Sequence, residues 1–416
     1  MERQNVLVIG QGAREHALCQ ALAMSPWVDK MWASPGNPGM AELAHLDARE
    51  GLSAWLNLAQ EANALTVVGP EVPLAAGLSD ALRARGLAVV GPSRAGARLE
   101  SSKSYAKEVM RQCGIPTARS MTVDGLDAVK ALVASEWGLP VVIKEDGLAQ
   151  GKGVFVITNE GQWQRFLGQA RENQGPFIVE EYLEGREISV EVFTNGRDYV
   201  WLPPAVDHKR LSADQESPNT GGMGAYSPVP WLSQSQCQTI DRQILEPIVG
   251  YLGEQSIDYR GVLYVGLMMT TSGPYVLEFN VRLGDPEAEV VLPLLADDLY
   301  PWLAELAQGR LLKSKIADTG KRAVGVVMAA EGYPEHPVAG RTLEISTRVP
   351  GTRIFQAGTE MVDGHLRSRG GRVLTVVGLG DDFSEARAIA YRQISAVEFP
   401  GAQFRDDIAE DLSKHG

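Results

Sequence analysis

The stretch from 141 to 157 constrains this chain most, because it reads as a strand, a glycine-rich loop and a second strand. Two runs rich in Val and Ile flank a loop with glycines at 147, 151 and 153, which predicts a hairpin with a mobile tip. Glycine lets backbone N–H groups approach a ligand closely, and Lys144 and Lys152 add positive charge. The stretch therefore favours a polyphosphate site, although a flexible hairpin with two solvated lysines has the same pattern. It is not a P-loop, since a strand rather than a helix follows.

Length and charge limit the classes of partner. With 416 residues the chain is long enough for several domains of roughly 150 residues each. Its formal net charge of −13 opposes non-specific binding to nucleic acid, which depends on clustered cations. Any phosphate site must therefore be locally basic, and the glycine-rich stretch meets that condition.

The cysteines and the apolar runs indicate a cytoplasmic protein. Cys19, Cys113 and Cys237 are scattered and lack Cys-x-x-Cys spacing, so neither a disulfide framework nor a zinc site is expected. The apolar run before Gly10 is too short for a signal peptide. The sequence has no apolar stretch of the length needed to span a membrane, so we expect no membrane segment.

The N-terminal quarter reads as a small doubly wound domain. Residues 6–18 form a buried strand that runs through two glycines into a helix, as a Rossmann-like half begins. The helix N-terminus could bind an anion, although simple strand–helix packing has the same pattern. Glu15 stands where a dinucleotide fingerprint has its third small residue, which argues against NAD. Further strands at 65–68 and 87–90 are each followed by a Gly-Pro loop, and ligands bind at such strand ends.

The middle of the chain carries candidate base and substrate contacts. Residues 177–190 read as strand, turn and strand, so their backbone could meet a base edge and Glu187 a ribose; a hairpin with a solvated acidic turn is the alternative. Residues 205–228 read as a long loop with cations and a Gly-Gly-Met-Gly run, which favours a substrate loop. Asp207 and His208 within it are either an acid–base pair or a surface pair.

A second predicted hairpin, at 261–269 and 275–280, carries a candidate metal site. The period of two places Glu278, Asn280 and Arg282 on one face. A carboxylate and an amide oxygen, completed by phosphate oxygens and water, suit Mg²⁺; a simple Glu278–Arg282 pair is the alternative. Farther on, strands at 323–330 and 371–378 and an Ala-rich helix from Ser384 suggest a compact α+β closing domain.

Taken together, the motifs closely resemble the glycinamide ribonucleotide synthetase family, and they occur in order across the whole chain. The motifs are Gly10-x-Gly12-x-Arg14-Glu15-His16-Ala17-Leu18, Gly69-Pro70-Glu71, Lys144-x-Asp146-Gly147-Leu148-Ala149-x-Gly151-Lys152-Gly153-Val154, Asp207-His208-Lys209-Arg210, Asn219-Thr220-Gly221-Gly222-Met223-Gly224-Ala225-Tyr226-Ser227-Pro228, Glu278-Phe279-Asn280-x-Arg282-x-Gly284-Asp285-Pro286-Glu287 and Val327-Met328-Ala329-Ala330-x-Gly332-Tyr333-Pro334.

The resemblance implies a multidomain α/β and α+β fold and a reaction. An N-terminal Rossmann-like (pre-ATP-grasp) domain would span 1–102, an ATP-grasp core 103–121 and 189–319, an inserted lid 122–188 and a C-terminal α+β domain 320–416. The implied reaction joins glycine to 5-phosphoribosylamine through glycyl phosphate, with ATP as co-substrate and Mg²⁺ or Mn²⁺ as cofactor. The expected partners are these small molecules, with no nucleic acid and no membrane, and the expected state is a monomer.

The resemblance also implies roles for particular residues. Catalytic roles fall to Lys144, Asp207 and Arg282, with Arg282 facing glycine's carboxylate and Asp207 its ammonium group, and the metal ligands would be Glu278 and Asn280. The implied ATP-binding residues are Lys103, Lys144, Gly147, Gly151, Lys152, Gly153, Glu180, Glu181, Tyr182, Leu183 and Glu187. The implied substrate-binding residues are Gly10, Gly12, Glu15, Asn37, Pro70, Glu71, Asp207, Lys209, Asn219, Gly222, Arg282, Gly284 and Asp285.

Two alternatives remain open from the sequence. One is another ATP-grasp carboxylate–amine or bicarbonate ligase with the same ATP chemistry and a different nucleophile. The other is a non-catalytic nucleotide-binding regulator. Retention of both lysines, the metal pair and the substrate loop argues against the regulator.

Overall fold

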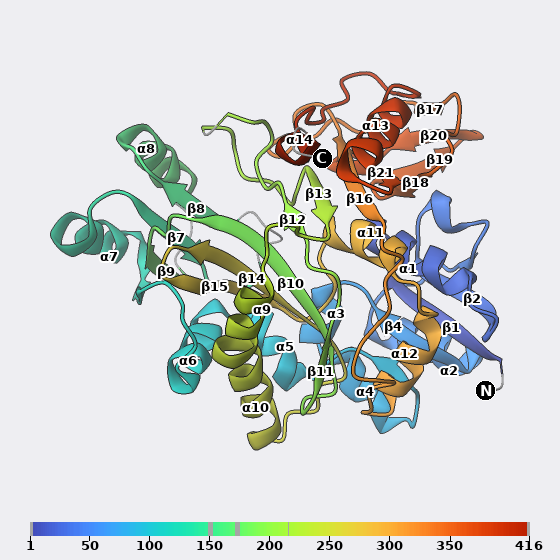
Figure 1. Cartoon of the computed structure of the whole chain (residues 1–416), viewed down its shortest axis with the longest axis horizontal. Helices are drawn as coiled ribbons and strands as arrows, with labels where there is room; N and C mark the ends of the chain where they lie inside the picture. The colour runs from blue at the N-terminus through green and yellow to red at the C-terminus, as the bar shows by residue number, and fades with distance from the viewer. Residues whose placement is uncertain (1–2, 149–152, 171–174, 215, 414–416) are drawn as a thin grey trace.

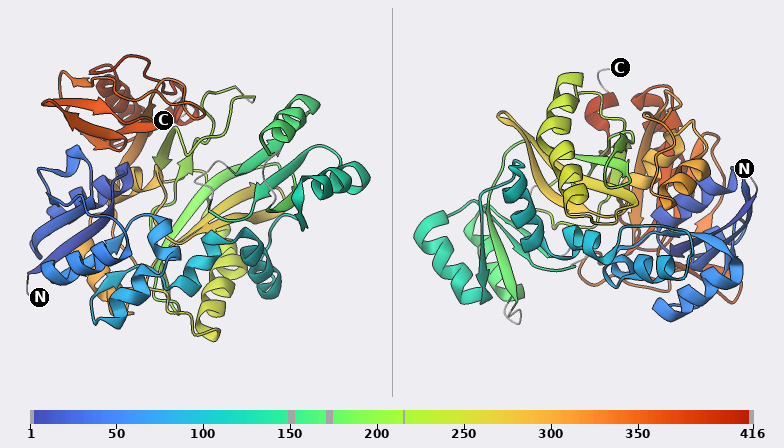
Figure 2. Two further views of the ribbon diagram at one scale, coloured as in Figure 1. Left: turned by 180° about the vertical axis from the view of Figure 1, so that it is seen from behind. Right: turned by 90° about the horizontal axis from the view of Figure 1, so that it is seen from below.

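The computed structural model describes residues 3–148, 153–170, 175–214 and 216–413, and it contains four regions (Figure 1). The N-terminal region, the central core and the C-terminal region lie against one another, and the lid region projects from the core away from the N-terminus (Figure 2). The tip of the glycine-rich loop, including Gly151 and Lys152, lies outside the described residues.

The N-terminal region is a parallel five-stranded sheet with the strand order β3-β2-β1-β4-β5. The expected doubly wound architecture is therefore confirmed. Its elements are β1 (Gln4–Gly10), α1 (Ala13–Ala23), β2 (Val28–Pro35), η1 (Pro38–Met40), β3 (His45–Leu46), α2 (Leu52–Ala62), β4 (Ala64–Val68), α3 (Glu71–Ala75), α4 (Leu78–Ala84) and β5 (Val89–Val90).

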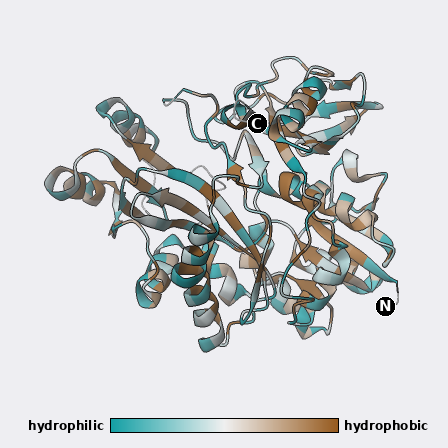
Figure 3. Ribbon diagram, viewed as in Figure 1, coloured by the Kyte–Doolittle hydropathy of each residue, from teal (hydrophilic) through white to brown (hydrophobic). Residues whose placement is uncertain are grey.

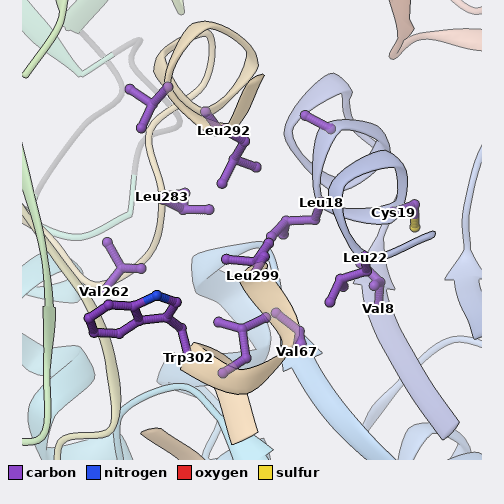
Figure 4. Close-up of a cluster of buried hydrophobic side chains, with 14 of the residues drawn as sticks. Val8, Leu18, Cys19, Leu22, Val67, Val262, Leu283, Leu292, Leu299 and Trp302 are labelled. Atoms are coloured by element: carbon purple, nitrogen blue, oxygen red, sulfur yellow. The ribbon is translucent and has the colours of Figure 1, made fainter. Parts of the chain in front are cut away.

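Both faces of this sheet are buried, and one of them is covered by the core. Successive side chains of β1 point to opposite faces, so Val6 and Val8 join one hydrophobic cluster while Leu7 and Ile9 join another. Figure 4 shows Val8 in the first cluster together with Trp302, which comes from core helix α12 (Leu299–Ala307). The N-terminal sheet and the core therefore share one apolar interior, which fixes the loops at the strand ends relative to the core.

The core is built on an antiparallel four-stranded sheet with the order β11-β10-β14-β15. The helical pattern predicted from residue 93 to 113 is interrupted at Ser102, whose backbone is extended. Two helices therefore form, α5 and α6, and the side chain of Ser102 caps the N-terminus of α6. The core elements are α5 (Arg94–Ser101), α6 (Lys103–Cys113), β10 (Arg186–Thr194), β11 (Tyr199–Trp201), α9 (Gln234–Ile240), η4 (Asp241–Leu245), α10 (Glu246–Glu254), β14 (Gly261–Thr270), β15 (Gly273–Asn280), α11 (Glu287–Val291), η5 (Leu292–Leu294) and α12.

The lid is a separate antiparallel sheet with the order β6-β9-β7-β8, covered by α7 and α8. Its elements are β6 (Ser120–Asp124), α7 (Gly125–Leu132), η2 (Val133–Trp137), β7 (Val141–Glu145), β8 (Val154–Ile157), α8 (Glu160–Gln169) and β9 (Pro176–Glu181). Lys144 pairs with Val154 across β7 and β8, as the predicted hairpin requires. β9 and β10 lie in different sheets, so the turn between them is not a hairpin but carries the chain from lid to core.

The C-terminal region is an antiparallel sheet with the order β12-β13-β16-β21-β18, accompanied by α13, and it matches the expected α+β domain. Two of its strands, β12 and β13, come from the stretch 205–228 that we expected to be a loop. Backbone pairing of β13 with β16 is what fixes them, and the sequence pattern does not reveal it. The elements are β12 (Val206–Asp207), β13 (Gly224–Ser227), β16 (Arg322–Ala329), β17 (Glu344–Ile345), β18 (Thr352–Gln356), β19 (Thr359–Val362), β20 (His365–Ser368), β21 (Arg372–Gly380), α13 (Phe383–Ile394), β22 (Val397–Glu398) and α14 (Glu410–Ser413).

Hydropathy follows this layering, with hydrophobic residues concentrated along the central strands of the sheets (Figure 3). Among the described helices, none combines the length and apolar character needed to cross a membrane.

A close approach at Gly69 gives a test of the N-terminal fold. A Cβ atom added there would lie 2.1 Å from Oε1 of Glu15, whose buried side chain has little room to move. We expect Gly69→Ala to lower the free energy of unfolding by about 1–3 kcal/mol, the usual cost of overpacking. Gly250→Ala is the matched control, because its Cβ would meet nothing within 4 Å. Scanning calorimetry should show a lower midpoint for Gly69→Ala only; equal midpoints would contradict the packing argument.

Candidate active site

A cleft of about 1120 Å³ opens where the N-terminal region, the core, the lid and the C-terminal region meet. Nearly all of the site residues inferred from the sequence, including Lys144, Asp207 and Arg282, line it. The inferred residues that line the cleft are Gly10, Gly12, Glu15, Pro70, Glu71, Lys103, Lys144, Gly147, Gly153, Glu180, Glu181, Tyr182, Leu183, Glu187, Asp207, Lys209, Asn219, Glu278, Asn280, Arg282, Gly284 and Asp285.

Two inferred residues within the described structure stand behind the cleft wall instead. The buried Asn37 amide donates to the carbonyls of Gln11 and Gln356, and its oxygen accepts from Gly39, so the side chain joins the N-terminal and C-terminal regions. Gly222 has φ +111°, and a Cβ there would lie 2.7 Å from Oδ1 of Asp207. It therefore allows the backbone to pass directly behind that carboxylate.

One end of the cleft carries paired lysines around a buried carboxylate. Glu180 is buried, and its oxygens lie 2.9 Å from Nζ of Lys144 and 3.0 Å from Nζ of Lys107. Lys144 also donates to the carbonyl of Leu277 on β15, which ties the lid hairpin to the core. Burial lowers the pKa of Lys107, and the Glu180 carboxylate opposes that shift. Two ammonium groups in an acidic chain make this end locally basic.

Lys103 brings a third ammonium group to the same end. Its Nζ donates to the carbonyl of Gly147 at the base of the glycine-rich loop, at 2.7 Å. The Asp146 carboxylate accepts from the backbone N–H of Lys103 and Ser104 at the start of α6. These contacts place the loop base against the helix that carries Lys103.

Glu278 and Asn280 line the cleft beside Lys209. Nζ of Lys209 lies 3.8 Å from Glu278 and 3.5 Å from Glu187. Burial alone would raise the pKa of Glu278, but Lys209, Lys144 and Lys103 hold it below its ordinary value, so the side chain is a carboxylate. Oxygen donors of these two types fit Mg²⁺, with other ligands from phosphate and water. No group of three or more His, Cys, Asp or Glu in the described part of the chain is arranged to hold a metal by itself.

Asp207 is a half-buried carboxylate whose Oδ1 is shielded from solvent and has no hydrogen-bond partner among the described residues. Burial and the negative charge of Glu287 raise its pKa well above the ordinary value. A cation placed against this group would restore its charge and satisfy its oxygen. The neighbouring His208 makes no hydrogen bond to it within the described structure, and burial lowers the pKa of that imidazole to about 4. The acid–base pair considered from the sequence is therefore not formed.

Arg282 is held by two carboxylates. Its guanidinium lies 2.9 Å from Glu100 and 3.4 Å from Glu71, and it donates to the carbonyl of Leu283. It does not pair with Glu278 in the described structure. A guanidinium has five N–H groups, so donors remain for a further anion in the cleft.

The glycine-rich start of α1 forms the opposite wall. Glu15 reaches back so that its carboxylate accepts from the N–H of Gly12 and pairs with Arg14. Gly10 has φ +126°, and a Cβ there would lie 2.6 Å from Glu15, so this loop needs glycine. Glu15 thus shapes the loop from inside, and its largely buried side chain lies at the cleft wall.

Arg372 brings the C-terminal region into the site. It pairs with Oδ1 of Asp285 at 2.9 Å and donates to the carbonyls of Gly221 and Asp285. Glu289 is fully buried near Asp285, and neither of its oxygens has a partner among the described residues. The cleft wall opposite the N-terminal region therefore depends on a residue from β21.

Three domain families of phosphoribosylglycinamide synthetase match this chain. The N domain matches residues 4–100, the ATP-grasp (A) domain 101–288 and the C domain 323–411. The chain belongs to the phosphoribosylglycinamide synthetase family.

Individual relatives agree over the full length. The phosphoribosylamine–glycine ligase of a Nostoc species is 43% identical, covering 97% of this chain and 98% of the relative. The enzyme of the same name from Caldanaerobacter subterraneus is 39% identical, covering 97% and 99%. A crystal structure of phosphoribosylamine–glycine ligase from Thermotoga maritima matches with a TM-score of 0.83 and 34% identity, over 97% of this chain and 100% of that one. The resemblance, the fold and the assignment as an ATP-grasp ligase of purine biosynthesis are confirmed.

Three residues were missed from the sequence: Lys107 and Arg372, which line the cleft, and Glu289, which is fully buried and does not line it. Lys107 had a signal, because it follows Lys103 by four positions on a helical pattern and shares its face. The sequence signal for Glu289 was weak, because Glu289 is only one of several acidic residues that follow Asp285. No sequence signal pointed to Arg372, since its contacts are with Gly221 and Asp285, which lie 151 and 87 positions away in the chain.

Glu191 beneath the cleft gives a pH test. Its Oε1 accepts from the N–H of Gly284, and burial, with Glu287, raises its pKa from 4.5 to about 8. The folded state therefore retains a proton that the unfolded state has lost, so this group lowers stability as pH rises from about 4.5 to about 8, by up to about 1.4 kcal/mol per pH unit. As the pH rises through this range, the thermal unfolding midpoint of Glu191→Gln should increase relative to that of the parent. Parallel curves of midpoint against pH would refute the assignment.

Proposed function

We propose that this chain joins glycine to 5-phosphoribosylamine, with ATP giving ADP and phosphate, through a glycyl phosphate intermediate. The observation that carries the proposal is that one cleft is lined by Lys103, Lys107 and Lys144 and also by Arg282 and Asp207. Oδ1 of Asp207 has no hydrogen-bond partner among the described residues. A polyphosphate and a zwitterionic amino acid need these opposite charges side by side. The relatives named phosphoribosylamine–glycine ligase support the choice of substrates.

Glycine's carboxylate is a poor electrophile, because attack by an amine would have to expel oxide. Transfer of the γ-phosphoryl group to it creates phosphate as the leaving group. Positioning and electrostatic stabilisation supply most of the catalysis of such a transfer. Lys103 and Lys144 face the phosphates in this scheme, and Gly147 and Gly153 flank the loop that covers them.

The rest of the nucleotide would lie along the strand that leaves the lid. Backbone groups from Glu180 to Leu183 meet the adenine edge, and Glu187 receives the ribose hydroxyls. Lys107 anchors Glu180 beneath this strand. Glu278 and Asn280 would hold Mg²⁺ or Mn²⁺, which neutralises charge on the transferred phosphoryl group when bound.

Glycine and 5-phosphoribosylamine would bind at the cleft walls away from the nucleotide. Asp207 binds glycine's ammonium group, and the free N–H groups of Arg282 bind its carboxylate. The phosphate of the ribosylamine lies at the Gly10–Gly12 loop, where the N-terminus of α1 offers a positive dipole end. The odd, scattered cysteines support a cytoplasmic enzyme, and we propose that it acts as a monomer within the domain boundaries given above.

Isotope transfer tests the acyl-phosphate chemistry. Glycine labelled with ¹⁸O in its carboxylate should deliver one labelled oxygen to the released phosphate during full turnover, because the bridging oxygen leaves with phosphorus. Mass spectrometry of the phosphate measures this. Unlabelled phosphate would refute the proposed intermediate. Omission of each substrate in turn is the control, and efficient turnover with an amine other than 5-phosphoribosylamine would favour another ATP-grasp ligase.

A metal titration tests the ligand assignment. Glu278→Gln replaces a charged oxygen ligand by a neutral one of the same size, so we expect half-maximal activity to need about tenfold more Mg²⁺. Glu398→Gln, the same change at an exposed carboxylate on β22 outside the cleft, is the control and should leave the Mg²⁺ requirement unchanged. The same Mg²⁺ dependence in Glu278→Gln and the parent would contradict the assignment.

A further inference from the structure

We propose that Asp285, held by Arg372, accepts the proton that the attacking amine loses in the second step of the reaction. The inference rests on the proposed function and adds an identity for the general base.

Asp285 lies where the two substrates of that step would meet. It belongs to the segment between β15 and α11, and its side chain is 18% exposed in the cleft. Oδ1 binds Arg372, whereas Oδ2 faces the N-terminal loop, 3.4 Å from the position that a Cβ would take on Gly12. One oxygen is therefore fixed by the protein and the other is directed toward the proposed ribosylamine wall.

Arg372 also sets this carboxylate relative to the proposed glycine site. The same guanidinium donates to the carbonyls of Gly221 and Asp285. The next residue, Gly222, lies directly behind the Asp207 carboxylate. A single side chain from the C-terminal region thus joins the proposed ammonium anchor and Asp285, and so limits the distance between the two.

Glu289 explains how Asp285 stays ready to accept a proton. Two neighbouring buried carboxyl groups do not both ionise readily, because each negative charge disfavours the other. Burial and the charge of Asp285 raise the pKa of Glu289 well above its ordinary value. Burial alone would raise the pKa of Asp285 too, but Arg372 and Arg14 hold it below its ordinary value, and Arg282 adds to this. Glu289 therefore holds the proton, and Asp285 remains an anion.

Other acids near this wall are already engaged. The Glu15 carboxylate accepts from Gly12 and pairs with Arg14. Oε1 of Glu287 accepts from the hydroxyl groups of Ser189 and Tyr264. Glu71 pairs with Arg282. Asp285 keeps Oδ2 toward the N-terminal loop.

The proton balance of the step is simple. The amine nitrogen forms a bond to the carbonyl carbon of glycyl phosphate, and the bond from that carbon to the bridging oxygen breaks. The electron pair leaves with phosphate, and the proton on nitrogen passes to Oδ2 of Asp285. Because Asp285 is partly exposed, the proton can leave to water after product release. A positioned base of this kind contributes about 10²–10⁴-fold.

The two chemical steps can be measured separately in the full-length enzyme. Reversible formation of glycyl phosphate moves a bridging ¹⁸O of ATP into a non-bridging position, and this exchange needs glycine but no amine. We expect Asp285→Asn to keep the exchange within a few-fold of the parent while glycinamide ribonucleotide formation falls about 10²–10⁴-fold. Asp381→Asn, the same change at a side chain that is 88% exposed, is the control.

Each outcome is informative. Absence of glycine-dependent exchange in the parent would refute the proposed intermediate, independently of Asp285. Equal loss of exchange and product in a folded Asp285→Asn enzyme would show a binding role and overturn the proposal, as would full product formation.

Discussion

Buried charge at the junction of the N-terminal, core and C-terminal regions is the constraint on which the cleft depends. An unpaired charge out of water is costly, so each arginine here is partnered, and each also makes a contact across a boundary. The contacts are Arg14 with the Leu283 carbonyl, Arg282 with Glu71 and Arg372 with Asp285. This core segment, from Asn280 to Glu287, is therefore held from the N-terminal and the C-terminal region at once, which gives a pre-organised wall.

Apolar packing supports this arrangement from below. One face of the N-terminal sheet is covered by α12, which follows the charged segment in the chain. Trp302 and Leu299 from that helix share a cluster with Val8 and Val67 from the sheet (Figure 4). The N-terminal loops cannot turn away from the charged segment without exposing this shared core. Hydrophobic burial therefore fixes how the two regions are placed, and the ion pairs fix the positions of the side chains in the cleft wall.

The opposite end of the cleft solves another electrostatic problem. A chain with net charge −13 has to gather cations for a polyphosphate. It does so by placing Lys107 and Lys144 on either side of Glu180, which balances their charge while they are buried. Lys103 joins them through the base of the glycine-rich loop. Because these lysines come from both core and lid, the positive end forms where the two regions meet.

The sequence by itself determined the elements and most of the site. Local propensity and periodicity decide strands, turns and helix faces. The hairpin at 141–157 and the position of Glu278 and Asn280 on one face of β15 could therefore be predicted. That Lys103 and Lys107 lie on the same face of a helix could also have been predicted, because residues four positions apart share a helix face. Only the tertiary structure decided that β9 and β10 lie in different sheets and that Arg372 meets Asp285. Such contacts join distant segments, and they follow from the burial and charge balance of the whole chain, which no local pattern records.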